Sequence, residues 1–425
     1  MGGRPADRSV AEDWWGPCDG GGASAELGPA FAAVWEPAEG EDGSDAGGGG
    51  SPSIRALTLN ILADGLARGS DGPSEPYVPC PEPFEQEGAG GVASRLGADP
   101  GADRFHFACA RGALAWARRW PRLRALILSA QPDLIGLQEV DLMQGGPENL
   151  VSHDKEIRRD LAKAGYQGAF AKKFGRACDG VALFWRTSRL QQAGTCETWR
   201  LGQSVHVALA QPLCLDGRWH LTAVCTHLKA GLAAEAEAAR LQQAQVLLQR
   251  LEGRQDAVVL ADLNAHCRPW RVEPEGPAAA AAGASSGTVE PQVHPLLSGS
   301  LQSAYQAVLG DEPAFTCWGG WVDREVRLVC DYILTKGCLL EPRRILQVPS
   351  ADDVLAYAER LPNAEHPTDH VPLVADFAIA QHEEGGLQSA GAYWQPAGAH
   401  WQPAGAHWQP AGAHWRPWKR QRQWW

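Results

Sequence analysis

Short runs of apolar residues, many of them β-branched, recur through the middle of the chain and predict β-strands. The predicted strands cover residues 53–62, 133–140, 180–186, 204–210, 218–228, 256–263, 327–335 and 370–379. Helical periodicity appears between some of them, in residues 232–251 (Leu241, Ala244, Leu248 and Leu251) and in residues 113–130 apart from Pro121. Because strands outnumber helices, the pattern favours an α/β sandwich over a doubly wound parallel sheet.

The patterned body, residues 53–380, is expected to form one domain with a full hydrophobic core, since the chain has 425 residues of which 44% are hydrophobic. Residues 67–103 and 273–292 are rich in Gly, Ala and Pro and add no new apolar pattern. We therefore expect both stretches to be loops inserted into the body.

The two flanking segments differ in composition from the body. Residues 1–52 are Gly-rich and acidic, and we expect them to be disordered. Residues 381–425 repeat WQPAGAH at 394, 401 and 408, and the Pro and Gly of each repeat disfavour a coiled coil. We expect a disordered tail. The alternative is a Trp-bearing arm of unknown partner, whose basic-aromatic end WRPWKRQRQWW would stack on bases or lie at an anionic surface.

Charge and cysteine content narrow the class of protein further. The formal net charge is −12, and the body carries about half of it, so the body has no general basic surface for duplex nucleic acid. The eleven cysteines contain no C-x-x-C pair, which predicts reduced thiols in a reducing compartment. No 18-residue apolar run and no signal peptide are found, and Ala6 weakens a myristoylation signal at Gly2. We expect a cytoplasmic or nuclear protein without a membrane partner.

Polar side chains stand at the ends of several predicted strands. In VVLADLNAH, residues 258–266, Asp262 and Asn264 follow a buried apolar run, where strands disfavour such residues. The other strand-end residues are Asn60, Gln138, Glu139, His227, Asp331, Asp369 and His370. Singly, each is more typical of a turn or a packed side chain. Together they predict a site at one rim of the sheets.

The residue types indicate the chemistry of this rim. Carboxylates, amides and imidazoles without thiolates suit a hard cation such as Mg²⁺ or Mn²⁺. Zinc is less expected, because no His-x₃-His pair or cysteine cluster appears in the sequence. A cation held by one or two carboxylates completes its shell with substrate phosphate, so we expect phosphoryl transfer to water.

Seven motifs in order resemble those of the endonuclease/exonuclease/phosphatase superfamily. They are TLNILADGL, QPDLIGLQEVD, DGVALFW, THLKA, LADLNA, CDYIL and PTDHVPLVADF, and within the superfamily they are most similar to nocturnin and the carbon-catabolite-repressor-type deadenylases. Residues 109–133 also resemble a helix of that group. The resemblance covers residues 53–380 and implies a four-layer α/β sandwich, in which two packed, mostly antiparallel sheets are flanked by helices.

The resemblance also implies a role for each residue. Glu139 would be the principal metal ligand with Asn60 beside it, Asp262 would orient or deprotonate the attacking water, and Asn264 would hold the scissile phosphate. His227 and His370 would contact phosphoryl oxygens. Asp369 would orient one of these groups, and Asp331 would tune the histidine or the metal shell.

Some positions depart from the family pattern. Ala261 replaces the usual Gly, Gly231 stands where nocturnin has a phosphate-gripping Arg, and Trp321 replaces a second Arg, with Arg324 only nearby. Lys173 does match a basic position, and Lys229 is the Lys of the THLK motif. Loss of two charged hydrogen bonds, each worth about 1.5–3 kcal/mol, would weaken the grip on a diphosphate dinucleotide.

Three functions remain open. We expect first a Mg²⁺-dependent hydrolase acting on RNA 3′ ends, as a poly(A)-type 3′–5′ exoribonuclease. The second is an NADP(H) 2′-phosphatase acting on an adenine dinucleotide. The third is a non-catalytic RNA- or protein-binding module, which the presence of Glu139, Asp262 and His370 disfavours.

Overall fold

The side chains of a central strand point alternately to two apolar faces of its sheet, so each face must pack against another layer. In strand β2 (Ser53–Asn60), Ile54 and Ala56 lie in the core between two sheets, whereas Leu57 and Leu59 pack toward helices on the outside. Side chains of a strand point alternately to its two faces, so a strand that is apolar on both faces must be covered on both. The computed structural model describes residues 35–37, 53–64, 107, 114–142, 152–272, 287–320, 325–363 and 365–380.

Two sheets form the centre of the described residues. The first has the order β1 (Trp35–Pro37), β17 (Leu340–Leu346), β18 (Leu373–Ile379), β2, β3 (Leu134–Asp141), β5 (Asp179–Arg186) and β4 (Tyr166–Lys172). The second has the order β13 (Gln302–Ser303), β16 (Asp331–Lys336), β10 (Ala257–Asp262), β9 (Trp219–His227), β8 (Val207–Leu215) and β6 (Leu190–Gln192), with β7 (Glu197–Arg200) also pairing with β8. Only the pairs β2–β3 and β9–β10 within these two sheets are parallel.

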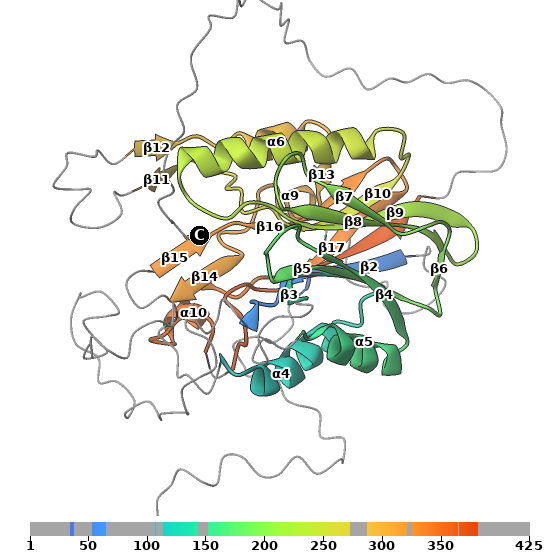
Figure 1. Ribbon diagram of the computed structural model, residues 1–425, viewed down its shortest axis with the longest axis horizontal. Coiled ribbons are helices and arrows are strands. Elements are labelled where there is room, and N and C mark those ends of the chain that lie inside the picture. The colour runs from blue at the N-terminus through green and yellow to red at the C-terminus, as the bar shows by residue number, and fades with distance from the viewer. Residues whose placement is uncertain are drawn as a thin grey trace, which may run out of the picture. The chain divides into compact units, whose positions relative to one another are not determined.

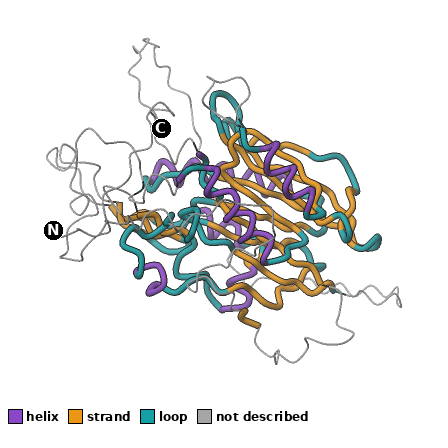
Figure 2. The backbone as a smooth tube through the Cα atoms, turned by 90° about the horizontal axis from the view of Figure 1, so that it is seen from below, coloured by secondary structure: helices purple, strands orange, loops and turns teal. Residues whose placement is uncertain are grey.

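Helices cover the outer faces of the two sheets (Figures 1 and 2). Helices α4 (Trp116–Ser129) and α5 (Asp154–Lys163) pack on the first sheet, and α6 (Ala234–Leu251) and α8 (Val293–Ser298) pack on the second. The described body is therefore a four-layer α/β sandwich, which confirms the fold expected from the sequence.

The remaining short elements lie around the sandwich. They are α9 (Ala304–Leu309), α10 (Ala351–Leu355), the pair β11 (Trp270–Val272) and β12 (Gly287–Val289), and the hairpin β14 (Cys317–Gly320) and β15 (Glu325–Leu328). Among the helices of the described ranges, none combines the length and apolarity needed to cross a bilayer.

Several elements differ from the sequence prediction. The predicted strand 327–335 is two strands, β15 and β16, so Asp331 begins a strand instead of lying inside one. Residues 35–37, in a segment expected to be disordered, pair with β17, and residues 287–289, in an expected loop, form β12. Pro121 lies within α4. Residues 67–103 and 381–425 lie outside the described residues.

The two sheets approach each other closely where a glycine of β3 faces β10. A Cβ placed on Gly136 would lie 2.5 Å from the Cβ of Leu260, which is shorter than a normal contact. Two residues further on, the Gln138 amide nitrogen donates to Thr58 Oγ1 at 2.9 Å within its own sheet and lies 3.3 Å from the Leu260 carbonyl oxygen of the other. These contacts therefore set the distance between the two sheets close to the strand ends that carry the polar residues.

We predict that Gly136→Ala lowers the free energy of unfolding by about 1–3 kcal/mol, because the added methyl group forces the sheets apart. Urea unfolding followed by circular dichroism measures the change. The matched control is Gly287→Ala, where an added Cβ meets no atom within 4 Å and the midpoint should be unchanged. Equal midpoints for the two variants would show that the sheets do not need this glycine.

Candidate active site

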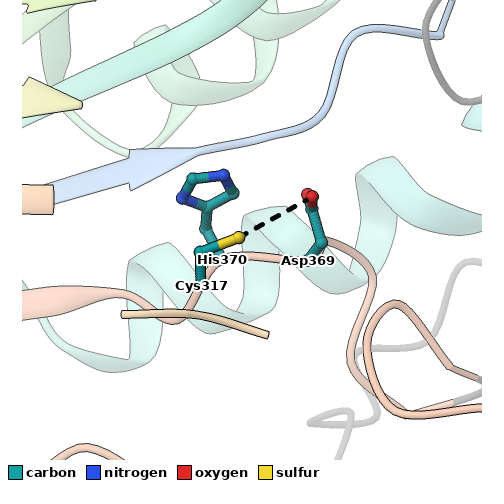
Figure 3. Close-up of side chains that lie close together, drawn as sticks. All are labelled: Cys317, Asp369 and His370. Atoms are coloured by element: carbon teal, nitrogen blue, oxygen red, sulfur yellow. Dashed lines mark hydrogen bonds between the residues drawn. The ribbon is translucent and has the colours of Figure 1, made fainter. Parts of the chain in front are cut away.

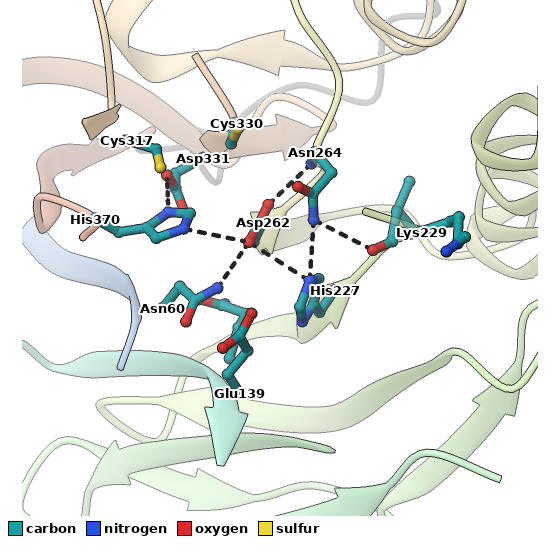
Figure 4. Close-up of polar contacts among 12 residues, drawn as sticks. Asn60, Glu139, His227, Lys229, Asp262, Asn264, Cys317, Cys330, Asp331 and His370 are labelled. Carbon is teal, nitrogen blue, oxygen red and sulfur yellow. Dashed lines mark hydrogen bonds and ion pairs between the residues drawn. The ribbon is translucent and has the colours of Figure 1, made fainter. Parts of the chain in front are cut away.

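Strand register brings three predicted residues side by side at one rim of the second sheet. Asp262 is the last residue of β10 and pairs with His227 of β9 on one side and with Asp331 of β16 on the other. In the first sheet, Asn60 ends β2 and pairs with Gln138 of β3. Figure 4 shows the side chains from both sheets converging on Asp262.

Asp262 is buried and receives hydrogen bonds from both sheets. The Asn60 side-chain nitrogen donates to Oδ2 at 2.9 Å, and the Asn264 backbone N–H donates to Oδ1 at 2.9 Å. The Asn60 amide oxygen accepts from the Leu62 backbone N–H at 2.9 Å, which fixes the orientation of the amide. The Asp262 carboxylate is therefore held rigidly between the sheets.

The surroundings of Asp262 favour its neutral form. Burial, followed by repulsion from Asp331, raises the pKa of Asp262 to about 7, against the opposing effects of His370 and the Asn60 hydrogen bond. A carboxylate with a raised pKa accepts a proton from water more readily than an ordinary aspartate does. This position suits a general base.

His370 is held as a cation by Asp331. Its Nδ1 lies 2.8 Å from Asp331 Oδ2, and Thr316 Oγ1 donates to the same oxygen at 2.7 Å. Burial lowers the pKa of His370, but Asp331, Cys317 and Asp369 together outweigh burial and raise the pKa well above the usual value. The other ring nitrogen, Nε2, lies 4.0 Å from Asp262 Oδ2.

His227 has the opposite character on the other side of Asp262. Burial first, and then the charges of Lys173 and neighbouring histidines, lower its pKa well below the usual value. Its Nε2 lies 3.0 Å from the Asn264 amide nitrogen and 3.6 Å from Asp262 Oδ2. Asp262 thus stands between a neutral and a cationic imidazole.

Lys173 and Lys229 border the site. The Lys173 amine lies 2.6 Å from Asp179 Oδ2 and 3.4 Å from His227 Nδ1. Burial and then the charges of these two lysines lower the pKa of nearby His206 to about 3. Positive charge therefore collects on the His227 side of the rim.

Glu139 occupies a strained position that points it into the rim. It has φ of +57° at a β-bulge in β3, and its Oε2 accepts from the Ala63 backbone N–H at 3.0 Å. Leu62 and Asn264 also have positive φ values, 58° and 48°. Backbone strain of this kind persists where the surrounding structure enforces it, which is common at functional sites.

The donors around Glu139 fit a hard divalent cation. Burial, then repulsion from Asp179 and Asp369, raises the pKa of Glu139. A cation would relieve this repulsion, and the oxygen donors are of the type that Mg²⁺ uses. Glu139 would hold the ion, with Asn60 next to it (Figure 4).

Most of the predicted site residues lie together at this rim, with two qualifications. His370 Nδ1 donates to Asp331, which orients the ring, whereas Cys317 Sγ donates to the Asp369 carboxylate at 4.0 Å (Figure 3). Arg324 lies outside the described residues. Thr316, Asp179 and Cys317 were not singled out in the sequence, because no strand-end pattern marks them.

We predict that Asp331→Asn lowers the pKa of the His370 ring, because the neutral amide removes the largest cation-stabilising charge while burial persists. Histidine ring signals in an NMR pH titration report the change, with His370→Gln identifying the signal. Asp216→Asn, at a surface turn, is the control. An unshifted His370 titration in Asp331→Asn would contradict this assignment.

Comparisons with known proteins identify relatives of this chain. The family model described as "Endonuclease/Exonuclease/phosphatase family" matches residues 109–370. Nocturnin from Homo sapiens is 28% identical over 357 residues, covering 79% of this chain and 67% of that protein. Nocturnin from Xenopus laevis is 30% identical over 309 residues, covering 68% of this chain and 70% of that protein.

A solved structure shares the fold. The crystal structure of ANGEL2, described as a 2′,3′-cyclic phosphatase, superposes with a TM-score of 0.53 at 17% sequence identity, covering 81% of this chain and 97% of that one. The family match spans more than half of the chain and includes Glu139, Asp262 and His370. The chain belongs to the endonuclease/exonuclease/phosphatase family and is a nocturnin-like phosphoesterase.

Proposed function

We propose that the protein is a Mg²⁺-dependent hydrolase that cleaves phosphate esters in adenine-containing nucleotides, with the 3′ end of RNA as its substrate. The observation that carries the proposal is the placement of Asp262, a buried carboxylate with a raised pKa, between neutral His227 and cationic His370. Hydrolysis of a phosphate ester needs a base for water and a cation for the phosphoryl oxygens, and this arrangement provides both.

The residues of the site have separate roles in hydrolysis. Asp262 accepts a proton from the attacking water, and Asn60 and the Asn264 N–H keep its carboxylate in place. His370 donates a hydrogen bond to a phosphoryl oxygen as negative charge develops there. Glu139, with Asn60 beside it, would hold Mg²⁺, which would supply further charge stabilisation when bound. The rigid strand ends hold these groups at fixed positions before substrate arrives.

His227 and Asn264 complete the proposed phosphate site. The two side chains already contact each other at 3.0 Å, and the Asn264 amide nitrogen also lies 3.3 Å from the Leu228 carbonyl oxygen. An incoming phosphoryl oxygen would replace one of these contacts with a hydrogen bond from the Asn264 amide. The pair is therefore ready to receive phosphate without a change in the backbone.

The cations near the rim favour a single phosphate group over a diphosphate. Lys173 is already paired with Asp179 at 2.6 Å, and Gly231, with φ of +120°, stands where nocturnin has an Arg. A diphosphate dinucleotide would meet fewer charged donors here. NADP(H) is the second candidate substrate, supported by the overall likeness to nocturnin. If the protein were only a non-catalytic binding module, the paired charges of this site would have no function.

The prediction for catalysis is tested by offering four substrates to purified full-length protein with Mg²⁺: an oligoadenylate, NADP⁺, NADPH and adenosine 2′,3′-cyclic phosphate. The cyclic phosphate is included because a neighbouring structure contains adenosine-2′,3′-vanadate. We expect AMP release from the oligonucleotide, and a decrease of at least about 10³-fold in Asp262→Asn, since the base is lost. Glu139→Gln is the metal-site control.

The alternatives give different outcomes. Release of inorganic phosphate from NADP(H) alone would identify a 2′-phosphatase, and opening of the cyclic phosphate alone would identify a cyclic phosphatase. Full activity in folded Asp262→Asn would contradict the proposed base. Inactivity toward all four substrates would support the binding module.

A separate prediction concerns Lys173. We expect Lys173→Met to lower kcat/KM by about 10- to 100-fold, because the variant loses one charged hydrogen bond to the substrate phosphate. Lys172→Met is a closely matched control, because the Lys172 amine is directed to the backbone carbonyls of Lys173 and Gly175. Equal kinetics for the two variants would remove Lys173 from the substrate site.

A further inference from the structure

Two exposed apolar side chains come from adjacent loops at the His227 side of the rim. The Phe174 backbone N–H donates to the Val205 carbonyl oxygen at 2.8 Å, so the segment that follows β4 runs beside the segment that joins β7 to β8. The Phe174 residue is 40% exposed and Val205 is 41% exposed. An exposed apolar pair bordered by polar groups is a candidate binding surface.

Both apolar residues are sequence neighbours of residues that contact the proposed active site. Lys173, which precedes Phe174, places its amine 3.4 Å from His227 Nδ1. His206, which follows Val205, packs edge-on against the His227 ring, with the ring centroids 6.4 Å apart. A ligand lying on Phe174 and Val205 would therefore continue into the site on the side where His227 is expected to contact phosphate.

The charged side chains of these two loops are basic. Arg200 places its guanidinium carbon 4.9 Å from the centre of the Phe174 ring, in a cation–π contact. Arg176 lies two residues after Phe174 and is exposed. Residues 173–178 and 200–206 contain no acidic residue, and the aspartate that follows the first segment is already paired with a lysine. The surface thus combines an aromatic ring with positive charge.

We infer that Phe174, Val205, Arg176 and Arg200 form a binding surface for single-stranded RNA, which holds nucleotides on the 5′ side of the one that is cleaved. A base of any identity stacks on an aromatic ring, and arginine side chains attract the phosphates between the bases. Single-stranded RNA therefore matches both the ring and the charge of this surface. The inference deepens the proposed function and rests on it for the direction of the strand, whose 3′ end would lie at Asp262.

This surface distinguishes a single strand from a duplex and from the shortest substrates. In a duplex the bases stack on one another, so their faces are not available to Phe174. A substrate that ends within the active site has no base to place on the ring. We therefore expect affinity to rise with the length of a single strand and to depend only weakly on its base sequence.

Removal of single bases from the RNA tests the stacking contact. Fluorescence anisotropy in EDTA measures binding of labelled eight-nucleotide oligoadenylates to full-length protein without hydrolysis, and each oligonucleotide of a series lacks one base. We expect the parent to lose at least about fivefold in affinity when one particular upstream base is missing. Phe174→Ala should show the same loss with the intact strand and no further loss when that base is removed, because both changes delete one contact.

Two variants serve as controls for the stacking contact. Phe174→Trp keeps an aromatic ring at this position and should keep the parent's affinity. Leu309→Ala removes a side chain of α9 that is 46% exposed, and it should leave RNA binding unchanged. Arg176→Gln should lower the slope of log affinity against log salt concentration by about 0.7, the value for one phosphate contact on a single strand.

The outcomes separate this surface from the proposed function. Equal affinities of the parent and Phe174→Ala for the intact strand, or no binding by the parent, overturn the surface even where RNA is hydrolysed. Binding that depends on Phe174 supports the surface even where no RNA is hydrolysed, a result that would overturn only the proposed reaction. Where hydrolysis is measurable, Phe174→Ala should lower the ratio of kcat/KM between the eight-nucleotide strand and a diadenylate by at least about fivefold.

Discussion

The buried carboxylate of Asp262 is the constraint on which the rest of the site depends. A charge removed from water is costly unless hydrogen bonds and nearby charges compensate it. The compensation here comes from Asn60 of one sheet, from the Asn264 N–H that follows β10 of the other, and from the cationic His370, so the site exists only while both sheets stay together. The same burial that threatens stability raises the pKa of Asp262 and makes it useful as a base.

The spacing of the sheets gives this network its rigidity. Gly136 allows β3 to approach Leu260 of β10, and Gln138 links the two sheets just below Asn60 and Asp262. Glu139 then follows in a β-bulge with positive φ, so its side chain turns toward the metal position instead of continuing the alternation of the strand. Small changes in sheet packing should therefore affect the metal ligand and the base together.

Strand ends could be read from the sequence because polar residues there interrupt apolar runs. This pattern located Asp262, Asn264 and Glu139, and the motif order gave the fold. It could not assign the partner of His370, since Asp369 is the neighbour in sequence whereas Asp331 belongs to another strand, and only the folded structure shows that the ring pairs with Asp331. The opposite charge states of His227 and His370 depend on burial and on neighbours distant in sequence, which no local pattern encodes.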